Sequence, residues 1–198
     1  MTTALIVVDV QNDFCPGGRL VVENGDEVVA PINAMMATAP AVILTQDWHP
    51  ADHLSFADNH AGSEPFDTVE LLYGTQVLWP AHCVQGSAGA AFHTGLNTDR
   101  ADLILRKGFR TTIDSYSAFF ENDQTTETGL AGYLRDRNIT ALTFAGLATD
   151  FCVAWSALDA AKLGFSVTVA LNACRAIDLD GSLDAALARM TDAGVTIT

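Results

Sequence analysis

Positively charged side chains are scarce in this sequence. Its 198 residues include 10 Lys and Arg against 24 Asp and Glu, which gives a formal net charge of −14 at pH 7. A surface of this sign repels phosphate backbones and anionic lipid headgroups. The composition therefore argues against nucleic acids and membrane surfaces as partners.

Long apolar runs and secretion signals are also missing. No stretch approaches the ~20 apolar residues that a membrane-spanning helix needs. The apolar run 4–8 has no basic segment before it and ends at Asp9, so it predicts a first strand rather than a signal peptide. The cysteines show no C-x-x-C spacing and, in a chain with a full core, need not form disulfides; they are Cys15, Cys83, Cys152 and Cys174. We expect a protein of the reducing cytoplasm.

Glycine-rich phosphate-binding loops are absent as well. The first apolar run leads into Asp-Val-Gln-Asn-Asp-Phe rather than into G-x-G-x-x-G, and G-x-x-x-x-G-K-[ST] does not occur. Binding of a dinucleotide or of a nucleoside triphosphate through such a loop therefore loses its main support.

Short apolar runs alternate with segments of helical length and periodicity. We expect strands at 4–8, 41–44, 103–105, 141–145, 167–170 and 196–197, and helices at 28–38, 128–137, 151–163 and 182–193. Continuously apolar strands separated by helices are typical of a parallel sheet that is covered on both faces. We predict that residues 1–198 form a single α/β domain, a three-layer sandwich with a mainly parallel, Rossmann-like sheet of about five or six strands.

Residues 48–100 interrupt this alternation. The segment has little regular periodicity, yet it contains all five histidines and two of the three tryptophans. Long irregular segments inside compact domains are usually functional. We expect an insertion that builds a metal site and a binding pocket.

Polar residues follow several of the expected strands. They are Asp9, Asp47, Lys107 and the turn 147–150 that leads to Cys152. Ligands of open parallel sheets bind beyond the carboxyl ends of the strands, where these positions converge. The pattern predicts a site at this edge of the sheet.

Cys152 is the candidate nucleophile. Thr149 or Asp150 is placed to cap the following helix, with Cys152 in its first turn. Free amides and the helix dipole favour a thiolate there and can hold an oxyanion. Asp9 is the candidate proton acceptor, and Lys107 would stabilise both charged groups. The alternative is a buried, inert cysteine.

A carboxylate and two imidazoles form a candidate metal site. Asp47-x-His49 follows the second expected strand, and His82 lies in the irregular segment. With water completing the shell, this set suits zinc, manganese or iron(II). His53 is a further candidate ligand, Cys83 is taken as structural, and unliganded surface histidines are the alternative.

Three aromatic residues lie close to these positions in the sequence, namely Phe14, Trp79 and Tyr116. They favour a slot for a flat aromatic ring, because planar groups stack on aromatic side chains. Ordinary core aromatics are an equally good interpretation.

Six blocks of the sequence resemble bacterial nicotinamidases of the isochorismatase-like cysteine hydrolases. In family order they are Val8–Phe14, Gln46–Pro50, Trp79–Gln85, Arg106–Gly108, Asp114–Phe120 and Gly146–Val153. The blocks around the aspartate, lysine and cysteine are shared by the superfamily. The metal blocks point to nicotinamidases and pyrazinamidases.

The resemblance implies hydrolysis of nicotinamide to nicotinate and ammonia in NAD salvage, with pyrazinamide as a further substrate. Cys152 would form a thioester, Asp9 would move the proton, and Lys107 would stabilise the pair. The N–H groups of Ala148 and Cys152 would form the oxyanion hole, with a cis peptide before Ala148.

For the metal, the resemblance implies that Asp47, His49 and His82 hold a divalent ion, zinc ahead of iron or manganese, which binds the pyridine nitrogen. Phe14, Trp79 and Tyr116 would line the ring pocket. Relatives complete the metal shell differently, so the roles of His53 and Ser55 stay open.

Several alternatives remain at this point. They are another isochorismatase-like amidohydrolase, such as an isochorismatase or an N-carbamoyl amidase, a metal-water hydrolase in which Cys152 only packs, a thiol redox protein and a non-catalytic metal scaffold. A homo-oligomer is compatible with the sequence.

Overall fold

A six-stranded parallel sheet forms the centre of the protein. The computed structural model describes residues 2–198, and the sheet has the order β5-β2-β1-β6-β7-β8. Its strands are β1 (Thr2–Val8), β2 (Val42–Asp47), β5 (Leu103–Lys107), β6 (Ile139–Leu147), β7 (Ser166–Arg175) and β8 (Thr196–Ile197). The predicted fold class is confirmed.

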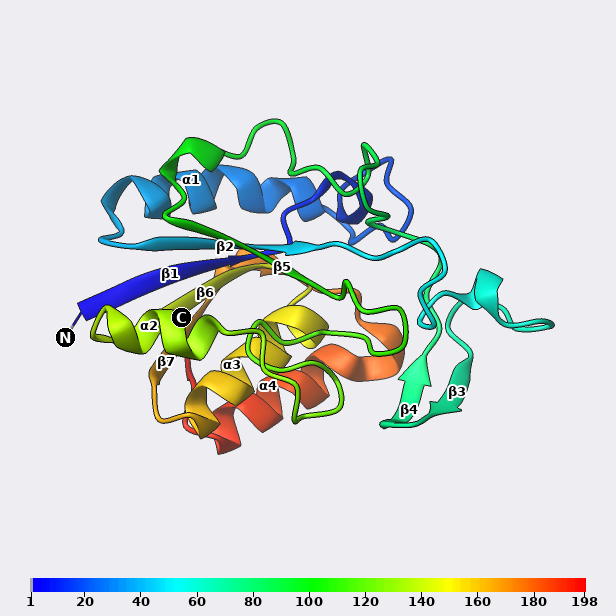
Figure 1. The fold of residues 1–198 in the computed structure, drawn as a ribbon. Helices are drawn as coiled ribbons and strands as arrows, with labels where there is room; N and C mark the ends of the chain where they lie inside the picture. Colours follow the sequence, from blue (N-terminus) through cyan, green and yellow to red (C-terminus); the bar gives the residue numbers. More distant parts are fainter. Residues whose placement is uncertain (1) are drawn as a thin grey trace.

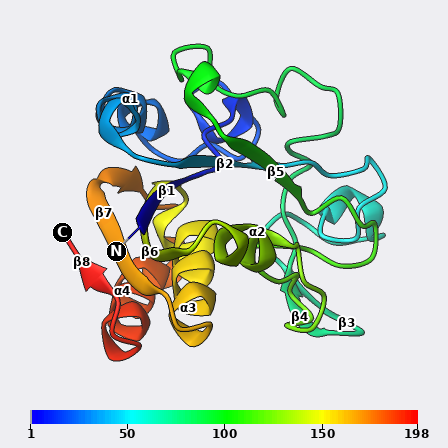
Figure 2. The same cartoon turned by 60° about the vertical axis from the view of Figure 1, so that its left-hand side comes forward.

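Helices cover both faces of the sheet. Helix α1 (Val29–Thr38) lies on one face, and α2 (Leu130–Asp136), α3 (Ala154–Lys162) and α4 (Ser182–Asp192) lie on the other (Figure 1, Figure 2). The helix expected at 151–163 begins later, at Ala154, because a π-helical turn precedes it. Among residues 2–198, no helix has the length and apolarity that crossing a membrane requires.

Strand β1 shows why the apolar runs are continuous. Leu5 and Val7 pack in the core on the α1 side, with Ile32 and Met36 of that helix. Ala4, Ile6 and Val8 point to the opposite core, formed with α2, α3 and α4. Because alternate side chains enter two buried layers, every position in the run is apolar.

The segment 48–100 is less irregular than expected. It contains an antiparallel hairpin of β3 (Thr68–Leu71) and β4 (Gly74–Val77), which the sequence did not predict. The hairpin is a separate two-stranded sheet. It stands beside the carboxyl ends of the central strands, outside the two helical layers (Figure 1).

Candidate active site

The structure brings the four strand-end positions together. Asp9 follows β1, Asp47 ends β2, Lys107 ends β5, and Cys152 follows β6. Asp47 and Lys107 are direct register partners on neighbouring strands. Gly146 lets β6 approach β1 here, because a Cβ at this residue would lie 2.1 Å from the carbonyl oxygen of Val8.

Lys107 is the centre of a buried charged group. Its Nζ lies 2.8 Å from Oδ2 of Asp9 and 3.5 Å from Sγ of Cys152. It also donates hydrogen bonds to Oδ1 of Asp47 and, at 2.9 Å, to the carbonyl of Ser115. Two carboxylates and a carbonyl thus compensate one ammonium group, as a buried charge requires.

Burial shifts the pKa values of both Asp9 and Cys152. It raises the pKa of the Asp9 carboxyl, although Lys107 and the 2.6 Å hydrogen bond from Thr45 Oγ1 oppose this. Burial also raises the pKa of the Cys152 thiol well above its ordinary value, against the opposing charge of Lys107. This direction is opposite to the thiolate that the helix start was expected to favour.

The local backbone explains this correction. Cys152 lies in a π-helical turn, Thr149–Val153, ahead of α3 rather than in its first turn, and no side chain caps that turn. Asp150, expected as a cap, is instead hydrogen-bonded to the main chain at Ile177 and Asp178. The peptide bond between Leu147 and Ala148 is cis.

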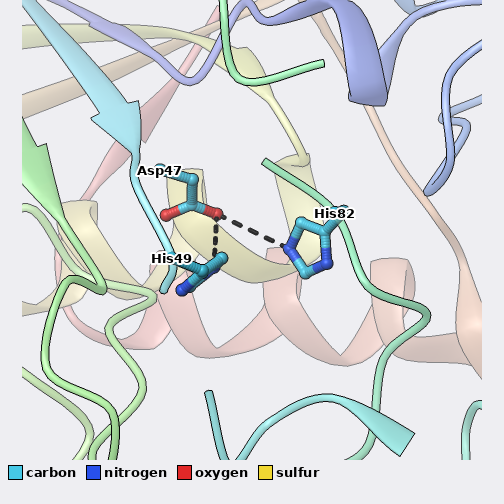
Figure 3. Close-up of side chains that lie close together, drawn as sticks. All are labelled: Asp47, His49 and His82. Carbon is cyan, nitrogen blue, oxygen red and sulfur yellow. Dashed lines mark ion pairs between the residues drawn. The ribbon is translucent and has the colours of Figure 1, made fainter. Parts of the chain in front are cut away.

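Asp47, His49 and His82 form a compact donor group (Figure 3). Oδ2 of Asp47 lies 3.5 Å from Nε2 of His49 and 3.9 Å from Nε2 of His82. Each histidine turns its Nδ1 to a main-chain carbonyl at 2.8 Å, that of Gly108 for His49 and that of Pro80 for His82. A carbonyl only accepts, so Nδ1 carries the hydrogen and both Nε2 atoms are free to bind a metal.

The electrostatics of this group also suit a cation. Burial opposes the negative charge of Asp47, but Lys107 and then His49 outweigh it and hold the pKa of this carboxyl far below its usual range. Burial lowers the pKa of His82 to about 4, which leaves its imidazole neutral. Burial would likewise lower the pKa of His49, but the facing Asp47 raises it. A cation bound here would take the place of the proton that Asp47 stabilises on the His49 ring.

The side chains of His53 and Ser55 form a hydrogen bond with each other. Nδ1 of His53 lies 2.7 Å from Oγ of Ser55, and its Nε2 lies 3.3 Å from the carbonyl of Ile113. With His49 and Asp114, His53 forms a second group whose ligand atoms lie within 4.8 Å of one another. The structure thus places His53 beside the Asp47–His49–His82 group rather than within it.

A cavity joins Cys152 to the Asp47–His49–His82 group. It is partly open to solvent and is lined by Phe14, Leu20, Asp47, His49, Trp79, His82, Asp114, Tyr116, Ala148, Phe151, Cys152 and Ile177. The three aromatic residues predicted for a ring pocket are among them. Sequence reasoning missed Leu20, Asp114, Phe151 and Ile177. Asp114 and Phe151 lie inside the sequence blocks 114–120 and 146–153 that resemble the family, whereas no motif in the sequence points to Leu20 or Ile177.

The β3–β4 hairpin supports the aromatic wall through Gln76, which is buried. Gln76 Nε2 donates to Tyr116 Oη at 2.9 Å and to Oδ2 of Asp114 at 2.9 Å. Tyr116 Oη also accepts a 3.1 Å hydrogen bond from Nε1 of Trp79. The pocket wall therefore depends on a strand that the sequence did not reveal.

Comparisons with known proteins agree with this geometry. Residues 3–198 match the model of the isochorismatase domain. The chain belongs to the isochorismatase family. Within the family it is 54% identical over 192 residues to a nicotinamidase of Acinetobacter baylyi, covering 97% of this chain and 90% of that protein. The predicted resemblance to bacterial nicotinamidases is confirmed.

Solved structures of the isochorismatase family give the same result. One, a nicotinamidase and pyrazinamidase of Acinetobacter baumanii, superposes with a TM-score of 0.98 at 55% identity, over 99% of this chain and 95% of that one. Another, a pyrazinamidase of Pyrococcus horikoshii in complex with zinc, has a TM-score of 0.80 at 33% identity, over 100% and 99% of the two chains.

Proposed function

We propose that this isochorismatase-family protein is an amidohydrolase that converts nicotinamide to nicotinate and ammonia, in NAD salvage, and also accepts pyrazinamide. The observation that carries the proposal is the cavity in which the Cys152 sulfur and the Asp47–His49–His82 group share one space beside aromatic walls. The names of its relatives support this choice of substrate. We also propose that residues 1–198 form a single domain, because the residues that line this cavity all lie on the central sheet and on the loops that follow its strands.

In the first half of the reaction, Asp9 accepts the Cys152 proton as Sγ attacks the carboxamide carbon. The amides of Ala148 and Cys152 hold the oxyanion. The C–N bond then breaks, the proton on Asp9 passes to the leaving nitrogen, and ammonia departs from a thioester on Cys152. Lys107, 2.8 Å from Asp9, keeps the carboxylate and the developing thiolate compensated throughout.

In the second half, water replaces ammonia. Asp9 takes a proton from the water that attacks the thioester carbon, a C–O bond forms, and the C–S bond breaks. The sulfur recovers its proton from Asp9, and the acid leaves. The original Cys152 proton leaves with ammonia and a proton from the attacking water replaces it, so Asp9 and Cys152 are ready for the next cycle without an external reagent.

We further propose that Asp47, His49 and His82 hold a divalent metal ion, zinc ahead of iron or manganese. The free Nε2 atoms and the shared carboxylate oxygen support this assignment, and so does the relative solved with zinc. When bound, the ion supplies a Lewis-acid contact for a ring nitrogen. Phe14, Trp79 and Tyr116 would orient the ring beside it.

A metal-water hydrolase is the second candidate, because burial raises the pKa of Cys152 and the donor group faces the same cavity. Ammonia release by Cys152→Ala decides between them. We expect the variant to lose turnover of nicotinamide while it keeps its fold and its metal, and Cys152→Ser serves as a near-isosteric check. Retained turnover in Cys152→Ala would show that metal-activated water, and not the sulfur, attacks the amide.

The reciprocal variant is His49→Ala. It should lose metal and mainly raise KM for nicotinamide, because the sulfur, carboxylate and ammonium group stay in place. A loss of kcat with unchanged metal content would contradict the orienting role of the ion.

A further inference from the structure

We propose that Ile177 limits the size of the aromatic ring that the cavity accepts, and that Asp150 is the positioning residue that holds Ile177 in place. The inference rests on the proposed function and deepens it, because it defines the substrates as small amides with few ring substituents. Neither residue takes part in the proton and acyl transfers described above.

The Asp150 carboxylate binds the segment between β7 and α4, residues 176–181. Its Oδ1 accepts a 3.1 Å hydrogen bond from the main-chain N–H of Ile177. Its Oδ2 accepts a 2.8 Å bond from the N–H of Asp178 and a further bond from Oγ of Ser182. Asp150 is only 2% exposed, so these three donors compensate its buried charge.

The 176–181 segment needs such an anchor. Asp178 and Asp180 have φ angles of 53° and 51°, a left-handed conformation that residues other than glycine rarely adopt without support from their surroundings. The two N–H groups bound by Asp150 belong to Ile177 and to the residue after it. Asp150 therefore fixes the main chain from which the Ile177 side chain projects.

Ile177 is an isolated part of the cavity wall. It lines the same space as Phe14, Trp79 and Cys152. Among the described residues that line this cavity, it alone follows α3 in the chain. A β-branched side chain has few rotamers, so it yields little to a larger ring as long as its backbone is held.

The anchor and the nucleophile share one turn. Asp150 lies in the π-helical turn Thr149–Val153 with Cys152, and the proton acceptor Asp9 lies elsewhere, after β1. The hydrogen bonds that the Asp150 side chain accepts come from residues 177, 178 and 182, so loosening them should change which rings fit more than it changes the chemistry of the sulfur. A changed preference among rings would therefore distinguish a positioning role of Asp150 from general support of the fold.

The test is a comparison of nicotinamide with its 2-, 4-, 5- and 6-methyl derivatives. Ammonia release gives kcat/KM for the wild type, Ile177→Ala and Asp150→Asn. In Ile177→Ala, at least one methyl isomer should gain about tenfold or more relative to nicotinamide, since one methylene in a pocket is worth roughly 10–200-fold. Asp150→Asn should favour the same isomer by a smaller factor and raise KM for nicotinamide more than it lowers kcat.

The matched control is Asp102→Ala. Oδ2 of Asp102 accepts a 2.8 Å bond from the N–H of Val42 at the opposite end of the strands, so its loss should leave the ranking of the amides unchanged. An unchanged ranking in Ile177→Ala, or an equal loss of kcat for all amides in Asp150→Asn, would overturn the inference. A wild type inactive on nicotinamide would overturn the proposed function, and this inference with it.

Discussion

Asp47 and Lys107 face each other across neighbouring parallel strands, and one oxygen of Asp47 accepts a hydrogen bond from Lys107 Nζ. The other oxygen faces Nε2 of His49 and of His82. One carboxylate therefore belongs both to the group that contains Cys152 and to the Asp47–His49–His82 group. The charge that favours a cation also helps to keep Lys107 protonated. Burial alone would lower the pKa of this ammonium group, but Asp47 and Asp9 raise it.

Asp47→Asn should impair both groups at once. The amide keeps the shape of the side chain but removes its charge, so we expect metal affinity to fall by about 100-fold or more and ammonia release to fall with it. Asp9→Asn is the matched control, which should lose turnover while its metal content stays normal. Metal analysis and ammonia release on both variants test this, and full metal retention by Asp47→Asn would contradict the shared role.

Thr45→Val should move the acidic limb of the pH–activity profile. Thr45 Oγ1 donates to the Asp9 carboxylate, which lowers the pKa that burial raises. Asp9 acts as a base only when ionised, so kcat/KM falls as the pH falls through its pKa. Without the donor this pKa rises, and the limb should shift to higher pH by roughly one unit or more, since a hydrogen bond to a charged group contributes about 1.5–3 kcal/mol.

Thr45→Ser keeps the hydroxyl and provides the control for this shift. Its acidic limb should coincide with that of the wild type. A limb that stays in place in Thr45→Val, or that moves to lower pH, would show that a group other than Asp9 governs the profile.

The central sheet was predictable because its strands are buried on both sides. Each produces a continuous apolar run, as in β1, where alternate residues enter the two cores. The hairpin was not predictable, because Thr68–Leu71 and Gly74–Val77 are four residues each, mostly exposed or half-buried, and carry no such run.

The candidate site was predictable to the extent that strand ends converge. Asp9, Asp47, Lys107 and Cys152 could be grouped because the carboxyl ends of parallel strands meet at one edge. Contacts that depend on strand order and register could not be predicted, and the Asp47–Lys107 pair is of this kind. The raised pKa of Cys152 was missed for a similar reason, since it follows from how deeply the fold buries the sulfur.

Gly108→Ala should displace His49. A Cβ at Gly108 would lie 2.4 Å from Cε1 of the His49 ring, and the carbonyl of Gly108 accepts the hydrogen of His49 Nδ1. We expect metal affinity to fall by about 10–100-fold, as it does when the partner of a ligating histidine is lost. Metal titration against a chromogenic chelator measures this.

Gly62→Ala controls for backbone strain in this experiment. Gly62 has a φ of 83°, comparable with 65° at Gly108, but a Cβ there meets nothing within 4 Å. Gly62→Ala should lose on the order of 1 kcal/mol of stability from backbone strain alone. Gly108→Ala should lose more, because its Cβ also meets the His49 ring, and only this variant should lose metal affinity. Equal metal affinities in the two variants would contradict the proposal that Gly108 positions His49.

Iodoacetamide should modify Cys152 before Cys174, Cys83 or Cys15. All four thiols are buried, and burial raises the pKa of Cys15 to about 11 and that of Cys174 to about 12. Only Cys152 combines a place in the cavity with a carboxylate that can take its proton. Iodoacetamide is itself a small primary amide, so it should enter where the substrate enters, and peptide mass spectrometry after brief labelling identifies the site.

Saturating nicotinate should protect Cys152 from this reagent, and Asp9→Asn should slow its modification because the proton acceptor is lost. Cys174→Ser should leave the labelling rate of Cys152 unchanged, since Cys174 bonds to the carbonyl of Ala170 away from the cavity. Faster labelling of Cys174 or Cys15, or no protection by nicotinate, would mean that the sulfur at position 152 is not the group that meets the substrate.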